Sequence, residues 1–414
     1  MKLPDEERSP NTTEGVILAA DWGMEAGKRT VYAADVSSRV VRRILPNKPW
    51  TLAGVLDVAM SMAAKGSVVA AFDVPLGVPE SFLNVAAAIP LWRSPSNFVD
   101  LLSRACERPL FFAGTTDASQ WAIERPFFSV PAGDGGLKNY IAAAAGQGVD
   151  LYRDIDRRTG AKSAFIKSGV PGSVGSAACA LWQEIGPLLD RDRAFRMWPF
   201  EGELPVLRAS APVVLAEMYP RSAYATALLD GAVRLRPTLI VAKTKRETRR
   251  AAIEALHAAE WVRDQGVTIE NLVEAEANED DFDALITAAA LLRCELEGIP
   301  LYRSCVGSDR AEGSILGTGS VNLDLRARTF DPHSHRSSPS EPSSVTAPNR
   351  VATPNTVGAF QCPIPGCEKL YAKTRSGWDA HVGSRRNHPW WRQELESAED
   401  RKQQFAAEFP DFFR

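Results

Sequence analysis

The segment EDDFDALITAAALLR, residues 279–293, places several acids at the start of an Ala- and Leu-rich stretch. The pattern predicts a helix that is buried along most of its length. Acids in a first helical turn interact favourably with the helix dipole, and Asn278 or Asp280 can act as the N-cap. Asp283 lies one turn further into the apolar stretch, where an unpaired carboxylate is costly. This helix therefore needs partners for its acids from elsewhere in the chain.

Continuous apolar runs earlier in the chain predict the other main elements. The strand candidates are GVILAADWG (15–23), KRTVYAADV (28–36), SVVAAFDVPLGVP (67–79) and APVVLAEMYP (211–220). The second run follows the first after a short turn, which predicts a hairpin. Helical patterns lie between and after the runs, at 51–66, 176–189 and 244–266. This mixture predicts an α/β fold in which helices flank a mixed, mostly buried sheet.

Three of these strands end in a carboxylate, at Asp21, Asp73 and Glu217. Sites in open α/β sheets gather at strand ends and helix termini, so we expect these acids to meet Asp280 and Asp283. Clustered carboxylates repel one another unless a cation joins them. Mg²⁺ favours such oxygen ligands, and two ions about 3.5–4 Å apart can activate water for phosphodiester hydrolysis. The pattern therefore predicts catalytic acids around Mg²⁺ or Mn²⁺.

Each of these acids also has a purely structural interpretation. Asp21 can be an ordinary strand-end residue, and Asp73 can cap a turn before Val-Pro. Glu217 can pair with Arg221 or another basic residue. We expect Asp281 to face solvent, because it lies off the helical face that the other two aspartates share.

The ordered set of motifs resembles a known family. The matching segments are LAADWG, FDVPLGVP, LYRDIDRRTGAKSAF (151–165), GSVGSAACALW (172–182), AEMYPRSAY (216–224), DDFDALITAAAL (280–291) and EGSILGTG (312–319). Together they resemble the family called domain of unknown function 429, a group of predicted RNase H-like nucleases. The resemblance implies an RNase H-like body over residues 15–328. It also implies divalent metal held by Asp21, Asp73 and Asp283. The segment DWGMEAGKRT departs from it, because many relatives carry Gly-Cys-x-x-Gly-Trp there.

Two further segments are candidates for binding phosphate. The block LYRDIDRRTGAK carries Arg153, Arg157, Arg158 and Lys162, and arginine side chains match phosphate oxygens well. A surface network of ion pairs is the alternative interpretation. The Gly/Ser-rich loop SGVPGSVGSAA (168–178) leads into a helix and can offer free N–H groups to an anion. It lacks the lysine of a phosphate-binding loop, so the pattern favours a plain turn.

The C-terminal part predicts a separate small module. Residues 329–358 are rich in Ser and Pro and predict a disordered linker, as do the polar residues 1–14 for the N-terminus. Residues 359–390 resemble a two-cysteine two-histidine zinc finger. Its ligands would be Cys362, Cys367, His381 and His388, separated by four, thirteen and six residues. Four ligands leave no open position, so this Zn²⁺ would be structural. Residues 391–414 predict an amphipathic tail.

Charge and composition limit the remaining possibilities. The formal net charge is −3, so nucleic acid contact would depend on a local patch such as the basic finger. We expect no membrane association and, because no disulfide framework is apparent, a cytoplasmic location. The leading hypothesis is a metal-dependent nuclease that its finger tethers to DNA or RNA. The alternatives are a non-catalytic regulator that binds nucleic acid or protein through the finger or tail, and an actin-like ATP-dependent enzyme.

Overall fold

We analysed a computed structural model of the chain. The structure describes residues 15–64, 66–132, 136–189, 193–302, 309–332, 359–361, 370–372 and 397–408. The chain divides into two compact units, residues 1–338 and 339–414, which we describe separately. Most of the predicted linker, the first 14 residues and all four predicted zinc ligands lie outside the described residues. None of the described helices combines the length and the apolar character needed to cross a bilayer.

The first unit is built on one mixed sheet. Its strands are β1 (Gly15–Asp21), β2 (Thr30–Asp35), β3 (Val40–Arg43), β4 (Ser67–Phe72), β7 (Phe195–Met197), β8 (Val213–Met218), β10 (Thr268–Ile269) and β11 (Ile315–Leu316). The order is β10-β3-β2-β1-β4-β8-β11, and β7 also pairs with β8. Strand β2 runs antiparallel to β1 and β3, whereas the other pairs are parallel. The predicted α/β class with a mixed sheet and the predicted hairpin are confirmed.

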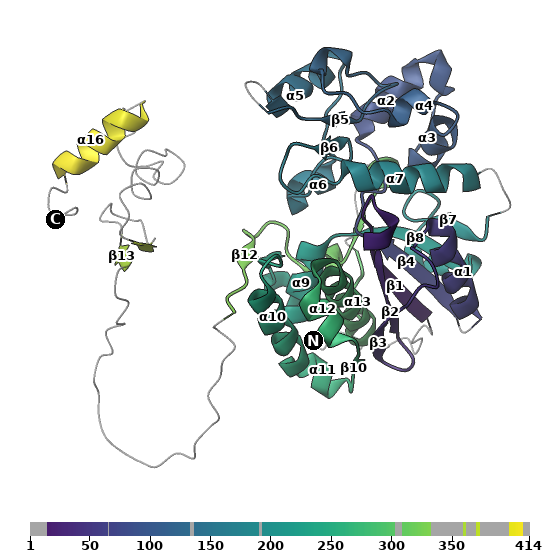
Figure 1. Ribbon diagram of the computed structural model, residues 1–414, viewed down its shortest axis with the longest axis vertical. Coiled ribbons are helices and arrows are strands. Elements are labelled where there is room, and N and C mark those ends of the chain that lie inside the picture. Colours follow the sequence, from purple (N-terminus) through teal and green to yellow (C-terminus); the bar gives the residue numbers. More distant parts are fainter. Residues whose placement is uncertain are drawn as a thin grey trace, which may run out of the picture. The chain divides into compact units, whose positions relative to one another are not determined.

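Helices cover both faces of this sheet, which explains the continuous apolar strands. Leu18 and Ala20 of β1 pack in one core with α1 (Leu52–Ala63) and α7 (Gly175–Ile185). Ile17 and Ala19 face the opposite core with α9 (Pro220–Leu228), α10 (Arg246–Ala258) and α13 (Glu279–Glu297). Helices lie on both faces of the sheet (Figure 1). Because side chains alternate along a strand, both alternating sets of side chains in these strands are buried.

A long insertion, residues 74–212, connects β4 to the neighbouring strand β8. It contains α2 (Glu80–Ala88), α3 (Phe98–Ala105), α4 (Pro109–Phe112), β5 (Phe128–Ser129), α5 (Gly136–Gly146), α6 (Asp154–Thr159), β6 (Ile166–Ser168), α7, β7 and α8 (Leu204–Ser210). Most of these elements gather at one end of the sheet (Figure 1). The insertion thus covers the end at which β4 and β8 finish.

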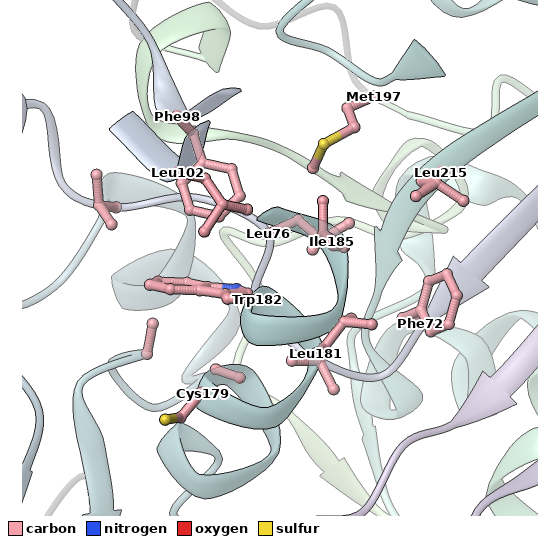
Figure 2. Close-up of a cluster of buried hydrophobic side chains, with 14 of the residues drawn as sticks. Phe72, Leu76, Phe98, Leu102, Cys179, Leu181, Trp182, Ile185, Met197 and Leu215 are labelled. Carbon is pink, nitrogen blue, oxygen red and sulfur yellow. The ribbon is translucent and has the colours of Figure 1, made fainter. Parts of the chain in front are cut away.

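Trp182 of α7 holds parts of this insertion together. Figure 2 shows its ring beside Phe98 of α3, with Leu181 and Ile185 between it and the sheet residues Phe72 and Leu215. The rings of Phe98 and Trp182 meet edge to face, with centroids 4.8 Å apart. The indole N–H of Trp182 also donates to the carbonyl oxygen of Pro75 at 2.8 Å. This contact fixes the loop that directly follows β4.

The C-terminal helices of the first unit form the layer on the other face. The predicted helix at 244–266 is two helices, α10 and α11 (Glu260–Asp264), separated by the extended residue Ala259. The short helix α12 (Leu272–Ala277) precedes α13, and the side chain of Asn278 caps α13 by accepting from the N–H of Asp280 at 2.8 Å. The unit continues to β12 (Arg328–Thr329), which pairs with β9 (Leu239–Ile240), and to the buried Phe330. The body therefore extends slightly beyond the predicted boundary at 328.

In the second unit, three short elements are described. Strands β13 (Ala359–Gln361) and β14 (Leu370–Ala372) pair antiparallel, with Phe360 opposite Tyr371. Helix α16 (Ala398–Glu408) lies in the predicted tail. Arg401 and Phe405 are buried and stand one turn apart, so one face of α16 is packed.

Candidate metal centre

Three carboxylates meet where β1, β4 and α13 come together. Asp21 is the last residue of β1, Asp73 follows the last residue of β4, and Asp283 lies in the second turn of α13. Each offers an oxygen, and these oxygens all lie within 4.8 Å of one another. We call Asp21, Asp73 and Asp283 the acidic triad. Three segments far apart in sequence thus build one cluster of oxygen ligands.

Strand register explains why the first two members meet. Strands β1 and β4 are parallel neighbours, and the N–H of Asp73 donates to the carbonyl oxygen of Ala20 at 3.0 Å. Asp21 continues the alternation of Ile17 and Ala19, whose side chains face the α13 layer. Asp73 continues the same alternation on β4. Helix α13 packs across β1, β2 and β3, which brings Asp283 to the same place.

The triad is electrostatically strained. Burial raises the pKa of Asp21 well above its usual value, and repulsion from Asp73 and Asp283 raises it further. Burial and the charge of Asp283 also raise the pKa of Asp73. Among the described residues, no group donates a hydrogen bond to the side chain of Asp21 or Asp73. A bound proton or cation would therefore stabilise the half-buried carboxylates of Asp21 and Asp73.

Asp283 has protein partners that the other two members lack. It is fully buried, accepts a hydrogen bond from the hydroxyl of Tyr224 and forms an ion pair with the ammonium of Lys243. Burial alone would lower the pKa of Lys243, but the nearby triad raises it above its usual value. Lys243 follows the apolar run that contains β9, so a strand-end cation was the available sequence signal that our prediction missed.

The charge balance of this cluster suits a divalent cation. One ammonium stands against three carboxylates, and Asp280 lies half-buried nearby, where its charge raises the pKa of both Asp21 and Asp73. Burial raises the pKa of Asp280 itself. The donors are all carboxylate oxygens, which suit Mg²⁺ or Mn²⁺ better than softer metals. The residues present therefore fit the metal that the sequence predicted, with Asp280 beside the triad and outside its ligand set.

Glu217 lies outside the acidic triad, on the opposite face of the sheet, although it lines the same cavity as Asp73 and Asp283 and its charge raises the pKa of Asp73. It pairs in register with Phe72, so it points away from the α13 layer. Its carboxylate forms two 2.7 Å hydrogen bonds with Arg153, and Asp156 pairs with the same guanidinium. Burial raises the pKa of Glu217 to about 7, although Arg153 opposes that rise. We call Arg153, Asp156 and Glu217 the buried arginine network.

The same network corrects the prediction for Arg153. Its side chain is 1% exposed, and both of its ion-pair partners are carboxylates. It is therefore not available to bind a phosphate at the surface, and it instead joins the insertion to β8. The alternative interpretation, that Glu217 pairs with Arg221 or another basic residue, is confirmed with Arg153 as the partner.

The other basic residues of that block separate into two groups. Arg157 and Arg158 are exposed and pair with Asp150 and Asp324, the second pair at 3.9 Å. This matches the alternative interpretation of a surface network of ion pairs. Lys162 is half-buried and lines a cavity that also contains Asp73 and Asp283. Of the four predicted phosphate-binding residues, Lys162 thus lies beside the triad.

Asp281 is buried, contrary to the expectation that it faces solvent. Its carboxylate forms an ion pair with Arg43 of β3, with Nε and Oδ1 2.6 Å apart. Helix α13 crosses β3 as well as β1. A residue that turns away from the triad therefore faces another strand.

The cavity beside the triad has a volume of about 390 Å³. Its polar lining comprises the acids Asp73, Asp283 and Glu217, the cations Lys243, Lys162 and Arg221, and the hydroxyl groups of Ser173, Tyr219 and Tyr224. We call it the triad pocket. It places acidic ligands and basic side chains around one small volume.

Comparison of the chain with protein-family models, with curated proteins and with solved structures found no match.

Proposed function

We propose that the first unit is a metal-dependent nuclease of the RNase H-like type. The observation that carries this proposal is the acidic triad, whose three oxygens lie within 4.8 Å of one another. When bound, Mg²⁺ or Mn²⁺ would activate a water and stabilise the leaving oxygen of a phosphodiester. Three carboxylates from two strand ends and one helix are a ligand set suited to that ion.

The residues around the triad would have distinct roles. Asp21 and Asp73 would hold the ion with oxygens that lack protein donors among the described residues. Asp283 would hold it from a side chain that Tyr224 and Lys243 fix in place. Lys243 would also limit the repulsion within the triad before an ion binds. Its ammonium can remain near the phosphate as a positive charge.

The topology supports the same proposal. The order β3-β2-β1-β4-β8, with β2 antiparallel to β1, agrees with the arrangement that the sequence resemblance implies. In that arrangement an acid on the first strand and an acid on a later strand meet acids on a late helix. Asp21, Asp73 and Asp283 stand at those positions. We therefore propose that the body belongs with the family called domain of unknown function 429.

We also propose that the second unit is a zinc finger that tethers the nuclease to nucleic acid. The antiparallel hairpin of β13 and β14 supports this, because a finger of this type has a ββα fold. Its Zn²⁺ would be held by Cys362, Cys367, His381 and His388 and would stabilise the fold. Mass spectrometry of the native full-length protein tests this: one tightly bound Zn²⁺ is expected, and a zinc-free protein would contradict it.

Isothermal titration calorimetry of the full-length protein with Mn²⁺ tests the metal site. Binding is expected in the wild type and should be lost in Asp21→Asn and in Asp283→Asn. Glu279→Gln is the matched control, because it removes one negative charge from the first turn of the same helix without touching the triad. Cleavage of single-stranded DNA and RNA is then measured with the same proteins. Unchanged cleavage by Asp21→Asn would refute the proposal.

Lys243 supports one alternative function, a non-catalytic binding protein that has kept the fold. Its ammonium already pairs with Asp283 inside the cluster, where it can replace part of the charge of a metal ion. In that case Lys243→Met should strongly destabilise the protein, and Mn²⁺ should bind only to the variant. If the protein is a nuclease, the wild type binds Mn²⁺ and Lys243→Met retains the metal but loses cleavage rate.

A further inference from the structure

The insertion forms part of a pocket around two members of the triad. The sheet and its helices contribute Asp73, Asp283 and Lys243 to the lining of the triad pocket. Residues 160–162 and 171–174 form a further part of its wall, and both segments belong to the insertion between β4 and β8. A ligand therefore reaches the carboxylates from within a walled cavity. This geometry limits what can be bound there more than an open sheet edge would.

Two cations of the pocket lack an acidic partner. Lys162 and Arg221 are both half-buried, and neither forms an ion pair with any described residue. They lie on the same wall: a Cβ added to Gly160 would be 3.4 Å from Nη1 of Arg221, and Lys162 is two residues further along. Gly160 has a φ of 77°, which favours a residue without a side chain. The pocket thus has a basic wall beside an acidic one.

Two helices also begin at this pocket. Residues 171–174 lead into α7, and residues 218–221 contain the start of α9. The N-terminal ends of helices carry partial positive charge and favour anions. The Gly/Ser-rich loop, for which the sequence favoured a plain turn, therefore lies at the basic side of the pocket. This wall therefore suits an anion, whereas the triad would suit a metal ion.

A neighbouring cavity gives a strand room to leave the pocket. It has a volume of about 710 Å³ and shares Gly160, Ala161 and Lys162 with the triad pocket. Tyr152 lines it, and the guanidinium of Arg157 lies 5.6 Å from the centre of that ring. Aromatic rings of this kind can stack with bases of a single strand. The two cavities thus offer a metal site in one and an aromatic ring in the other, with a basic wall that both share.

Size separates a strand end from a duplex. A volume of about 390 Å³ falls in the range of roughly 300–1,000 Å³ that is typical of small-ligand pockets. A duplex is too wide for such a pocket, because its major groove alone is about 12 Å wide. We propose that the triad pocket binds the phosphorylated end of a single nucleic acid strand, with Lys162 and Arg221 on the terminal phosphate.

The cleavage half of this inference rests on the proposed nuclease function, whereas the binding half does not. With the terminal phosphate on the basic wall, the next phosphodiester lies toward the triad. Hydrolysis there forms a bond between the water oxygen and phosphorus. It breaks the bond from phosphorus to the leaving sugar oxygen, which takes up a proton. The product would be a short fragment that carries the terminal phosphate.

Binding is tested first, with the full-length protein and five-nucleotide strands whose internal linkages are methylphosphonates, which resist hydrolysis. Three forms are compared in Mn²⁺: a 5′-phosphate, a 3′-phosphate and no terminal phosphate. One phosphorylated form is expected to bind at least about tenfold more tightly than the unphosphorylated form. Lys162→Gln and Arg221→Gln should each remove most of that preference. Arg158→Gln, an exposed arginine outside the pocket, should keep it. A finger that binds all three strands alike does not affect the comparison.

Several results would overturn the inference. Equal binding of all three forms would do so, as would a preference that survives in both pocket variants. If a mononucleotide binds as tightly as the five-nucleotide strand, the ligand of the pocket is a small phosphoester and not a strand end.

Cleavage then separates the two proposals. The substrates are a linear single strand and a covalently closed circle of the same sequence, and the linear strand is expected to be cut at least about tenfold faster. Equal cleavage of both would overturn the strand-end inference while leaving the nuclease intact. No cleavage of either, together with a phosphate preference in binding, would overturn the nuclease while leaving the strand-end site.

Discussion

Replacing Asp73 by Asn should have opposite effects on stability with and without metal. The change keeps the shape of the side chain and removes one of the carboxylates of the triad. The oxygens of the triad lie within 4.8 Å of one another, so one pair of like charges costs about 3 kcal/mol at an effective dielectric constant of about 20. The substitution also removes the attraction between Asp73 and Lys243, which offsets part of this gain in stability.

We therefore expect Asp73→Asn to raise the free energy of unfolding by about 1–2 kcal/mol in EDTA. For a body of this size, the melting temperature should rise by about 2–4 °C. In Mn²⁺ at about a hundred times its dissociation constant, the wild type should gain about 2.7 kcal/mol through binding, and the variant should gain little. The order of the two melting temperatures should then reverse.

Differential scanning calorimetry of both proteins, in EDTA and in Mn²⁺, measures this reversal. Glu279→Gln serves as the control, because it removes a charge from the first turn of α13 and leaves the triad complete. It should respond to Mn²⁺ as the wild type does. If Asp73→Asn is less stable than the wild type by the same amount in both conditions, Asp73 is a structural residue and the metal site is refuted.

Three other predictions concern stability. Arg153→Leu leaves Glu217 buried without its partner and should lower the free energy of unfolding by about 3–5 kcal/mol in urea denaturation. Replacement of an exposed arginine, Arg157→Leu, should change it little. A loss below about 1 kcal/mol for Arg153→Leu would contradict the role of Arg153 as the buried partner of Glu217. The folded protein raises the pKa of Asp21 above its unfolded value, so the stability that Asp21 contributes without metal should be fully present below about pH 4 and be lost as the pH rises through the raised pKa. Denaturation of the wild type and of Asp21→Asn in EDTA at several pH values checks this. The free energy of unfolding of the wild type should fall relative to that of the variant as the pH rises, and a relative rise would be inconsistent with the prediction. Gly77 has a φ of 140°, and an added Cβ would lie 1.8 Å from the carbonyl oxygen of Glu312. Gly77→Ala should therefore lower the free energy of unfolding by at least about 2 kcal/mol. Gly231→Ala, at a positive φ with open space around it, should lower it less.

The sequence predicts much of the fold because local patterns report burial. The apolar runs mark β1, β2, β4 and β8, since strands buried on both faces need no alternation. The acids that end β1 and β4 were likewise visible, because a carboxylate after an apolar run stands at a strand end. Asn278 was recognisable as an N-cap from its residue type and its place before the helix.

Other features depend on register and on pairing across the chain. Glu217 also ends an apolar strand, but its face follows from its register partner Phe72, which the sequence does not specify. Arg153 pairs with Glu217, which is 64 residues away in the sequence, so no local sequence pattern predicts the pair. Asp281 is buried because α13 crosses β3, and that crossing is a property of the packed layers.

The distribution of the triad along the chain has a consequence for synthesis. Asp21 and Asp73 leave the ribosome early, but Asp283 follows only after the whole insertion and most of the body. Domains form as units, and contacts between distant residues form late. A nascent chain would therefore present two repelling carboxylates and no complete set of ligands until α13 docks. Any cleavage that depends on the triad is thereby restricted to molecules whose first unit has finished folding.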